Sequence, residues 1–589
     1  MANHTHGSHP TPQARLLALL SEDKGDLGVL AVYTIVTGLL GLAMPLAVQS
    51  LVNSVAASTV QPLFVLSLLV LLGLLAAGWL SLLQLSLVET LQQRLFARSA
   101  LKIARNLIHS TSRALYGTYA PELANRFFDV LTVQKSLAKL LLDGLAAALQ
   151  AIVGLIILSF YDKSGLLLGF DVLVLLTIAF IIFPLGINGL RTSLAESAEK
   201  YHLAGWLEEL ARCQRSFKLH STPEFLLSHA EDRVAAWLKE RRRHFAVTFR
   251  QEAGSQLFSA LASAGVLAIG GYLVVQRELT LGQLIASQLI VANVVKATDK
   301  LLRQAETLYD LLTGLDKTGY LTDLETEREG GHEIPVSATG GASVALRDVH
   351  FTYPGGRAVL SGLNLTLQPG ERISLVGASG TGKSTLAALL GGLEEPTFGL
   401  IEVNGIELRG ASLSSLRERV NLMTDEDAIY EGTIEDNIRM GRPGISAENI
   451  RWAIELSQCT ADIAALPDGL QARLVPGGGN LSRGQAQRLL IARAIVDKPE
   501  LLIFDEAFSG LDENTTLAIL EGLFGPENPW TIIDISHEGP VVTRAETVYV
   551  LAEGKIVESG SPKALAAMPS SEFVRLFPLL SRMLQGASA

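Results

Sequence analysis

The sequence predicts a multi-domain membrane protein, with an all-α domain of six membrane-spanning helices followed by an α/β domain. Long charge-free segments before residue 296 predict the helices. A glycine-rich loop between an apolar strand and a helix, residues 377–385, predicts the α/β domain. Length and composition agree with two domains, one of them in a membrane. The chain has 589 residues, and its 18% of charged residues is below the roughly 25% typical of soluble proteins.

The charge-free segments predict where the six helices lie. Residues 27–88 contain no Asp, Glu, Lys, Arg or His, and this length holds two helices of about 20 residues each. We expect the turn between them around Asn53 to Pro62, where small and polar residues cluster. Four more charge-free runs follow, at residues 144–161, 172–190, 253–276 and 279–295. Buried helices of a soluble protein are the alternative for any one short run, but not for the series.

The connectors between the spans predict the orientation in the membrane. Lys and Arg concentrate in residues 89–143 and 191–252, whereas the opposite side has only Lys163 and Arg277. Since positive charge favours the cytoplasmic side, we expect both chain ends there. The all-α domain is therefore assigned to residues 27–323. Residues 1–26 form a cytoplasmic tail, in which Arg15 to Leu20 fits a short elbow helix along the membrane interface.

The α/β domain is expected at residues 342–578, between a linker at 324–341 and a C-terminal tail at 579–589. An apolar strand, Arg372 to Val376, leads into a loop with the phosphate-binding pattern of a glycine, four residues and Gly-Lys-Ser. The backbone N–H groups of such a loop face phosphates at the positive end of a helix, which predicts ATP binding. Lys383 is expected at the β- and γ-phosphates, and the Ser384 hydroxyl on Mg²⁺. The loop residues predicted to bind the nucleotide are Gly377, Ala378, Ser379, Gly380, Thr381, Gly382, Lys383, Ser384 and Thr385.

Two later strands carry further candidate catalytic residues at their ends. Leu501 to Phe504 reads as a buried strand that ends in Asp505 and Glu506. We expect Asp505 to hold Mg²⁺, directly or through water, and Glu506 to act as the general base on the attacking water. A structural acid at a strand end is the alternative for each. His537 follows a third predicted strand, Thr531 to Ile535.

Between the loop and Asp505 lies the sequence Leu481-Ser482-Arg483-Gly484-Gln485. In this order the three motifs resemble those of ATP-binding cassette (ABC) proteins, whose ATPase domains dimerise head to tail around two ATP. The resemblance implies that Ser482, Gly484 and Gln485 contact the ATP held by a partner subunit. It also implies that Tyr353 stacks on adenine and that His537 contacts the γ-phosphate, so that the catalytic residues are Lys383, Glu506 and His537.

Two positions depart from the family pattern. ABC exporters usually carry a glutamine before the Gly432-Thr433-Ile434 segment, where this chain has Asp425. Asp425 is expected to bind Mg²⁺ or water, at the cost of an extra negative charge. The third signature position is usually glycine and is Arg483 in this chain.

Membrane spans fused ahead of a cassette resemble a half-size ABC exporter. The resemblance implies two short coupling helices that touch the ATPase domain, near Glu122 to Val133 and near Glu208 to His220. It also implies a second half-transporter subunit, identical or different, in the lipid of a bacterial cytoplasmic membrane. A loose likeness of residues 125–129 and 140–144 to peptide and protein secretion transporters adds accessory secretion proteins as candidate partners.

The cargo is not evident from the sequence. A non-transporting ABC protein, such as an ATP-gated channel or a regulatory subunit, is the alternative function. A net charge of −11 gives no indication of nucleic-acid binding.

Overall fold

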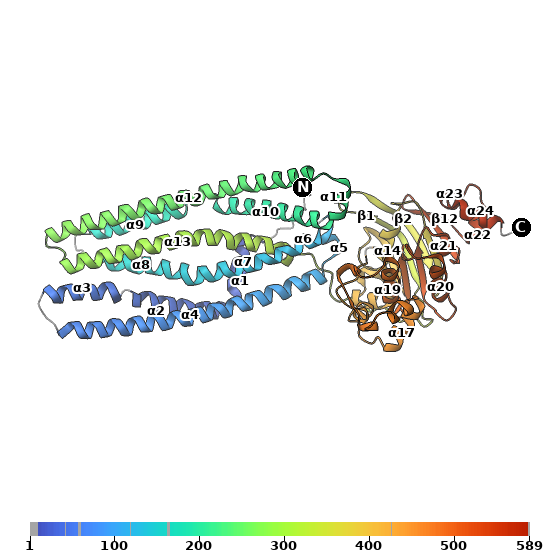
Figure 1. The fold of residues 1–589 in the computed structure, drawn as a ribbon, viewed down its shortest axis with the longest axis horizontal. Coiled ribbons are helices and arrows are strands. Elements are labelled where there is room, and N and C mark those ends of the chain that lie inside the picture. The colour runs from blue at the N-terminus through green and yellow to red at the C-terminus, as the bar shows by residue number, and fades with distance from the viewer. Residues whose placement is uncertain are drawn as a thin grey trace. The chain divides into compact units, whose positions relative to one another are not determined.

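The computed structural model describes residues 10–586, apart from 42, 57–60, 118, 162–164 and 426. The chain divides into two compact units (Figure 1). The helical unit contains the chain up to Glu325, except Thr111–Tyr116. The cassette unit contains Thr111–Tyr116 and the chain from Thr326 onward. Lys163, which the orientation argument used, lies outside the described residues, as does part of the predicted turn after Asn53.

Long helices that run along a common direction build the helical unit (Figure 1). Between α7 and α8 the chain forms a π-helical turn, η2 (Leu140–Gly144), and η1 (Arg126–Phe128) is a 3₁₀ turn. The α-helices of this unit are α1 (Pro12–Glu22), α2 (Lys24–Gly41), α3 (Ala43–Ala56), α4 (Gln61–Ile108), α6 (Ala120–Asn125), α7 (Asp129–Lys139), α8 (Leu145–Ser159), α9 (Leu166–Ile182), α10 (Gly189–Arg212), α11 (Gln214–His220), α12 (Pro223–Val275) and α13 (Leu281–Thr322).

Each of the six predicted spans falls on an apolar helix or helix pair. Among the described residues, five helical segments are long and apolar enough to cross a membrane, namely Lys24–Val55, Phe64–Ile108, Ala120–Ser159, Pro223–Val275 and Leu281–Thr322. The remaining span, the fourth along the chain, falls on α9, a shorter apolar helix of 17 residues. It begins six residues before the predicted span 172–190 and ends at Ile182, because a turn containing Pro184 separates it from α10.

The core of the helical unit forms around α13, which packs against α3, α7, α8 and α12. Apolar side chains of α8, α9, α12 and α13 make the largest cluster, with Leu158, Val266 and Ile290 almost fully buried. The predicted elbow segment is helix α1, whose Arg15 forms an ion pair with Asp323 at 2.5 Å. Leu16 and Leu19 of α1 pack against a second cluster that includes Val133 and Leu311.

The first predicted coupling segment, Glu122–Val133, covers most of α6, the turn η1 and the start of α7. Asp129, Val130 and Val133 are buried inside the helical unit, whereas Phe128 is 63% exposed. The segment of this connector that belongs to the cassette unit is Thr111–Tyr116, which contains the short helix α5 (Ser112–Leu115). The second predicted segment, Glu208–His220, covers the end of α10 and the largely exposed α11.

Two main sheets build the cassette unit. A four-stranded antiparallel sheet has the order β2-β1-β4-β5, and a six-stranded sheet has the order β12-β11-β3-β10-β9-β6. In the second sheet β11, β3, β10, β9 and β6 are parallel and β12 is antiparallel to β11. The strands are β1 (Val344–Thr352), β2 (Ala358–Leu367), β3 (Arg372–Val376), β4 (Phe398–Val403), β5 (Ile406–Glu407), β6 (Val420–Met423), β7 (Gly432–Thr433), β8 (Arg473–Leu474), β9 (Leu501–Asp505), β10 (Thr531–Ile535), β11 (Thr547–Ala552) and β12 (Lys555–Gly560).

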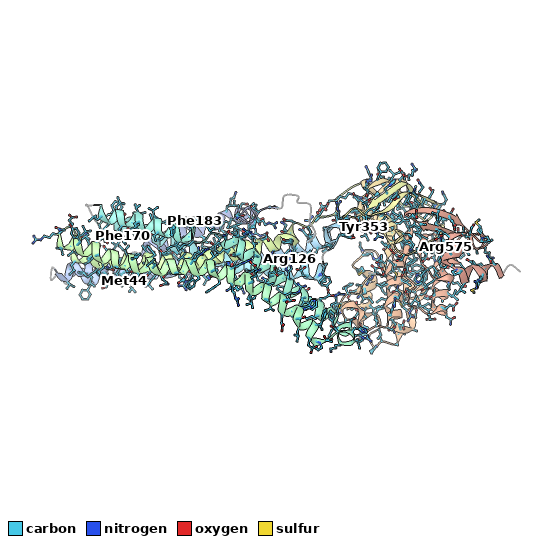
Figure 2. The ribbon with its side chains drawn as sticks, turned by 90° about the horizontal axis from the view of Figure 1, so that it is seen from above. Met44, Arg126, Phe170, Phe183, Tyr353 and Arg575 are labelled. Carbon is cyan, nitrogen blue, oxygen red and sulfur yellow. The ribbon has the colours of Figure 1, made fainter. Side chains whose placement is uncertain are left out.

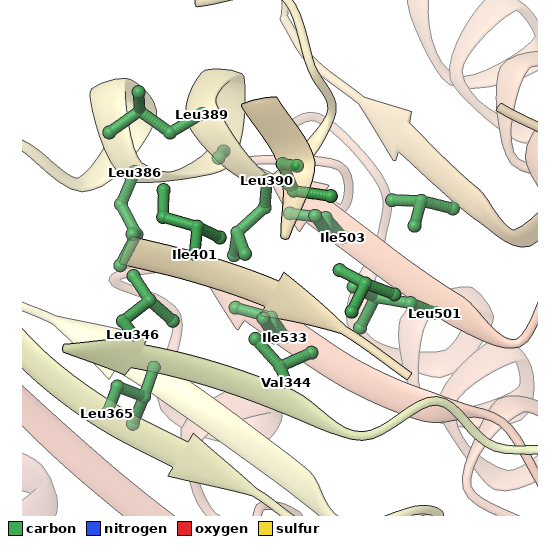
Figure 3. Close-up of a cluster of buried hydrophobic side chains, with 14 of the residues drawn as sticks. Val344, Leu346, Leu365, Leu386, Leu389, Leu390, Ile401, Leu501, Ile503 and Ile533 are labelled. Atoms are coloured by element: carbon green, nitrogen blue, oxygen red, sulfur yellow. The ribbon is translucent and has the colours of Figure 1, made fainter. Parts of the chain in front are cut away.

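Buried apolar side chains join the two sheets. Figure 3 shows Leu346 and Ile401 of the antiparallel sheet close to Leu386 and Leu390 of α14, and to Ile503 and Ile533 of the parallel sheet. Met423, Leu502, Phe504 and Ile532 belong to a second cluster, which they share with α16, α17, α19 and α20.

The larger helices of the cassette unit are α14 (Lys383–Leu390), α15 (Leu413–Arg419), α16 (Ile434–Arg439), α17 (Ala447–Leu456), α19 (Arg483–Ile495) and α20 (Glu513–Leu523). The shorter ones are α18 (Thr460–Ala464), α21 (Gly539–Val542), α22 (Pro562–Ala566), α23 (Glu572–Leu576) and α24 (Pro578–Gly586), together with the 3₁₀ turns η3 (Leu408–Gly410), η4 (Gly469–Gln471) and η5 (Pro476–Gly478). Thus most of the predicted C-terminal tail is helix α24, whose Leu580 and Leu584 pack against a buried cluster.

Candidate nucleotide-binding site

Parallel strands bring the predicted phosphate-site residues to one edge of a sheet. β3, β10, β9 and β6 are parallel neighbours, so their carboxyl ends meet along the same edge. The glycine-rich loop follows β3, and His537 follows β10. Asp505 ends β9, Glu506 comes next, and Asp425 lies two residues after β6. Four segments distant in sequence therefore converge on one side of the sheet.

The glycine-rich loop connects β3 to the N-terminus of α14. Gly382 is the N-cap residue, with φ 107°, in the left-handed region that favours glycine. A Cβ at this position would lie 2.8 Å from Leu360 Cδ2 and 2.9 Å from Val359 Cγ1. Gly380 also has a positive φ, of 80°. The loop shape thus depends on glycine and leaves backbone N–H groups at a helix N-terminus, which suits a phosphate.

Lys383 Nζ reaches back over this loop. It donates to the carbonyl oxygens of Gly377 and Ala378, each at 3.0 Å. Burial lowers the pKa of Lys383, whereas the nearby carboxylates of Asp505 and Glu506 raise it. In the described part of the chain this half-buried ammonium group donates to these two carbonyls alone, so it is well placed to turn to a phosphate oxygen.

Ser384, Asp505 and Asp425 lie close enough together to interact. Burial raises the pKa of Asp505, a hydrogen bond from the Ser384 hydroxyl lowers it, and the charge of Asp425 raises it again. Among the described residues no group of three or more His, Cys, Asp or Glu is arranged to hold a metal by itself. One or two carboxylates and a hydroxyl nevertheless fit Mg²⁺, which takes its remaining ligands from phosphates and water.

Glu506 and His537 come together at the carboxyl edge. His537 Nδ1 lies 3.6 Å from Glu506 Oε1, and both side chains are exposed. Glu506 has φ 55°, which is uncommon for a residue with a side chain. Its backbone N–H donates to the carbonyl of Ile535 at 2.9 Å, which ties the end of β9 to the end of β10. The carboxylate is therefore held at the strand ends while remaining open to solvent.

Tyr353 lies beside the phosphate loop. It directly follows β1, and its hydroxyl lies 3.1 Å from Thr385 Oγ1 in α14. One face of its ring stacks on Tyr116, with ring centroids 5.5 Å apart and an angle of 18° between the planes. The edge contact with Phe351 has a centroid distance of 4.8 Å. Figure 2 labels Tyr353 in the cassette unit.

The signature residues lie at the N-terminus of α19. Ser482 is the N-cap residue and forms a capping box with Gln485, at 3.2 Å and 2.9 Å. Within the described residues no hydrogen bond joins Ser482, Gly484 or Gln485 to the phosphate loop of the same chain. Arg483 extends to the loop after β9, where its Nη2 donates to Ser509 Oγ at 3.3 Å. The sequence did not predict this Arg483 contact, because the family pattern has no side chain at that position.

A buried polar pair joins the neighbouring strands β3 and β10. Asp534 of β10 is 1% exposed and accepts a hydrogen bond from Ser374 Oγ of β3 at 3.4 Å. Its Oδ1 has no hydrogen-bond partner among the described residues. Burial raises the pKa of Asp534 well above its usual value. Asp534 was not among the predicted site residues, although an aspartate within the apolar run Thr531–Ile535 was the available signal.

Comparisons with known proteins agree with this geometry. The family described as "ABC transporter transmembrane region" matches residues 27–297, and the family "ABC transporter" matches residues 360–509. An uncharacterized ABC transporter ATP-binding protein, y4gM of Sinorhizobium fredii, is 28% identical over 81% of this chain and 83% of its own length. The alpha-hemolysin translocation ATP-binding protein HlyB of Escherichia coli is 32% identical over 56% of this chain, which spans only 46% of that relative.

The fold of the whole chain is also represented among solved structures. The structure of a bacterial Atm1-family ABC exporter with ATP bound aligns with a TM-score of 0.81 at 22% identity, over 98% of both chains. The membrane-region match and the cassette match occur in one polypeptide, which is the architecture of a half-transporter. The chain therefore belongs to the ABC transporter family, with the transmembrane region and the cassette in one polypeptide.

Proposed function

We propose that the chain pairs with a second half-transporter and exports a substrate across a membrane by binding and hydrolysing ATP. The convergence of the phosphate loop, Asp505, Glu506 and His537 at one sheet edge carries this proposal. The same chain supplies the apolar helices that cross the membrane. Neither half alone would couple hydrolysis to movement of a solute.

In the proposed reaction, Lys383 leaves its two carbonyl partners and binds the β- and γ-phosphates. Glu506 accepts a proton from the attacking water, and its exposed carboxylate leaves room for that water. His537, close to Glu506 Oε1, orients the γ-phosphate or the water. Mg²⁺, held by Ser384 and Asp505 with Asp425 nearby, would neutralise phosphate charge.

Each chain supplies one phosphate loop and one signature. Ser482, Gly484 and Gln485 lie at a helix N-terminus that offers partial positive charge to a phosphate. They have no hydrogen bond to the phosphate loop of their own chain within the described residues. We therefore assign them to the ATP held by the partner subunit, and Tyr353 to the adenine in its own chain.

The location proposed is the bacterial cytoplasmic membrane, with the cassette and both chain ends on the cytoplasmic side. The concentration of Lys and Arg in residues 89–143 and 191–252 supports this orientation. Membrane lipid would then cover the exposed apolar side chains of α4, such as Leu71, Leu75 and Trp79.

The Glu506→Gln variant tests the chemistry. It removes the base and leaves the phosphate loop and the Mg²⁺ ligands in place. We expect ATP binding to persist while turnover falls by at least about a hundredfold, the lower limit for a general base. The measurement is ATP turnover by the full chain in nanodiscs, with Glu521→Gln, an exposed position on α20, as the control. Turnover like that of the wild type in Glu506→Gln would exclude the role given to Glu506.

ATP-dependent accumulation of a candidate cargo in sealed inverted vesicles then tests export. Transport that the Glu506→Gln variant abolishes supports the exporter function. ATP hydrolysis without movement of any cargo tried would favour a non-transporting ABC protein.

A further inference from the structure

A cavity of about 600 Å³ lies within the helical unit, between α6, α10, α12 and α13. Aromatic rings and cationic side chains line it together, including Tyr119, Arg126, Trp206, Arg233, Lys317 and Tyr320. Cavities of roughly 300 to 1,000 Å³ are typical of sites for small molecules. The cavity belongs to the helical unit alone and shares no residue with the nucleotide site.

Arg126 has an incomplete set of hydrogen-bond partners in this cavity. Its Cζ lies 4.1 Å from the centroid of the Tyr320 ring. Nη2 donates to Glu122 Oε1 at 3.5 Å, the outer limit of a hydrogen bond. Nε and Nη1 are buried and have no partner among the described residues. Buried, unpaired donors of a charged group are costly, so the arrangement calls for an acceptor that the described chain does not supply.

Two neighbouring side chains point to the same kind of acceptor. Trp206 Nε1 is also buried without a partner among the described residues. Lys317 is 8% exposed, and its Nζ lies 3.7 Å from Asp316 and 5.6 Å from the Tyr320 ring centroid. The donors without a partner among the described residues are therefore the Trp206 indole N–H and two N–H groups of Arg126, which suit an anion beside the Lys317 ammonium group.

Carboxylates near the cavity face these cations only at 3.5 Å or more, with Asp316 3.7 Å from Lys317. Glu209 accepts two hydrogen bonds from Arg212, at 3.1 Å and 2.6 Å, and is thereby neutralised. Glu122 forms an ion pair with Arg126, in which Oε1 lies 3.5 Å from Nη2. Arg233 stacks on Trp206, with its Cζ 5.7 Å from the ring centroid, and adds a third positive charge. Arg233 thus brings a positive charge to the aromatic walls without forming an ion pair among the described residues.

The position of the cavity favours a soluble ligand over a lipid headgroup. The apolar part of α13 ends near Val295, and Lys317 lies about 30 Å further along the helix at 1.5 Å per residue. Figure 2 likewise shows Arg126 far along the helical unit from Met44 and Phe170, which lie in its apolar part. A lipid phosphate at the membrane surface would not reach a cavity so far along the helices from their apolar part.

We propose that this cavity binds a small organic anion. A carboxylate or phosphate group of the ligand would accept hydrogen bonds from Arg126 and Trp206, with Lys317 adding charge. The apolar or aromatic part of the ligand would lie against Tyr119 and Tyr320. The proposal goes beyond ATP-driven export and does not depend on it, since binding can be measured without turnover.

The test uses the full chain in phosphatidylcholine nanodiscs with saturating ADP, which keeps the probe out of the phosphate loop. Calorimetry compares 2-naphthylacetate with the neutral analogue 2-(2-naphthyl)ethanol. We expect the acid to bind and the alcohol to bind at least about tenfold more weakly, because it loses charged hydrogen bonds. Arg126→Met, which keeps an apolar stem, is expected to lose binding of the acid by a similar factor. Arg243→Met, at an exposed arginine paired with Glu240, is the matched control and is expected to bind normally.

Two further variants keep the proposal testable if Arg126→Met folds poorly. Lys317→Met removes a second cation, and Trp206→Phe keeps the ring while removing the N–H. Each is expected to weaken binding of the acid but not of the alcohol. No binding of the acid by the wild type, or equal binding by wild type and all three variants, would overturn the proposal. Either result would mean that the Arg126 guanidinium is satisfied inside the protein, for example by Glu208, whose Oε2 is also buried without a partner among the described residues.

Discussion

The charge of Asp425 acts on Asp505, since it raises the pKa of that buried acid. This effect places the two carboxylates within electrostatic range of each other at the carboxyl edge of the sheet. Glu506 raises the pKa of Asp505 as well, so three acids share a small region that must also accept a triphosphate. Like charges at such distances disfavour ionisation, and Mg²⁺ binding must overcome this.

Removing the charge of Asp425 should therefore ease Mg²⁺ binding. We expect Asp425→Gln to keep or raise the basal ATPase rate and to lower the Mg²⁺ concentration for half-maximal rate. The decrease is expected to reach about tenfold at most, equivalent to about 1.4 kcal/mol. Asp425→Asn has the length of aspartate without its charge, so an equal shift in Asn and Gln would assign the effect to charge. An Mg²⁺ titration showing unchanged half-saturation in Asp425→Gln and Asp425→Ala would instead indicate that Asp425 points away from the nucleotide.

The contacts of the Arg483 side chain could not be predicted from the signature motif. The sequence identified the position as a departure from the family pattern but gave no partner for the side chain. In the fold it reaches Ser509, 26 residues later, and covers Gly510, where a Cβ would lie 2.9 Å from Arg483 Nε. Such a contact depends on how α19 packs against the loop after β9, which spacing along the chain does not determine.

At the scale of elements, apolar runs and turn residues predicted the catalytic strands well. The predicted strands Arg372 to Val376 and Thr531 to Ile535 have the same bounds as β3 and β10, and β9 extends the third by one residue. Short apolar runs that end in a loop motif have few alternatives. Strand order was not predictable in the same way, because the placement of β10 between β3 and β9 is a property of tertiary pairing.

The fourth membrane helix shows why charge alone is an imperfect guide. The predicted span began at residue 172 because Asp171 is ionisable, yet Asp171 is 3% exposed inside α9. Its Oδ2 accepts a hydrogen bond from Ser159 Oγ at 2.6 Å, so a neighbouring helix satisfies part of the polar group. The span also ends earlier than predicted, since Pro184 and the left-handed Asn188 follow α9.

The buried Asp534 of strand β10 makes the stability of the fold depend on pH. Because burial raises the pKa of Asp534, the folded state holds its proton at pH values where the unfolded chain, with a pKa of about 3.9, has lost it. The free energy of unfolding is then greatest at pH values below the pKa of Asp534 in the unfolded chain. It falls as pH rises, by up to about 1.4 kcal/mol per pH unit, until Asp534 ionises in the folded state.

The Asp534→Asn variant removes the ionisable group and keeps the shape. We expect its melting temperature, relative to the wild type, to increase between pH 5 and pH 8. The measurement is thermal unfolding of the full chain in detergent across this range, with Asp468→Asn, at an exposed aspartate, as the control. An identical pH trend in wild type and Asp534→Asn would show that Asp534 ionises freely in the fold.

At the scale of the whole molecule, the chain holds half of each proposed ATP site. The phosphate loop and Glu506 lie at the sheet edge, whereas Ser482 begins α19 and, in the described part of the chain, makes no hydrogen bond to that loop. On the proposed function, two chains together supply one complete site. Mixing Lys383→Ala chains with Ser482→Arg chains would place both lesions in one site and leave the other intact. We expect ATPase activity above that of either variant alone.

A disulfide crosslink between two different chains tests most directly whether each ATP site is shared between subunits. One chain carries Ser379→Cys and the other Ser482→Cys, both with Cys213→Ser and Glu506→Gln, while the native Cys459 is buried. We predict that ATP with Mg²⁺ produces a crosslinked dimer and that no crosslink forms when ATP is omitted. ATP binding without any crosslink between the two chains, or a crosslink of equal yield without nucleotide, would contradict the assignment of the signature to the partner's ATP.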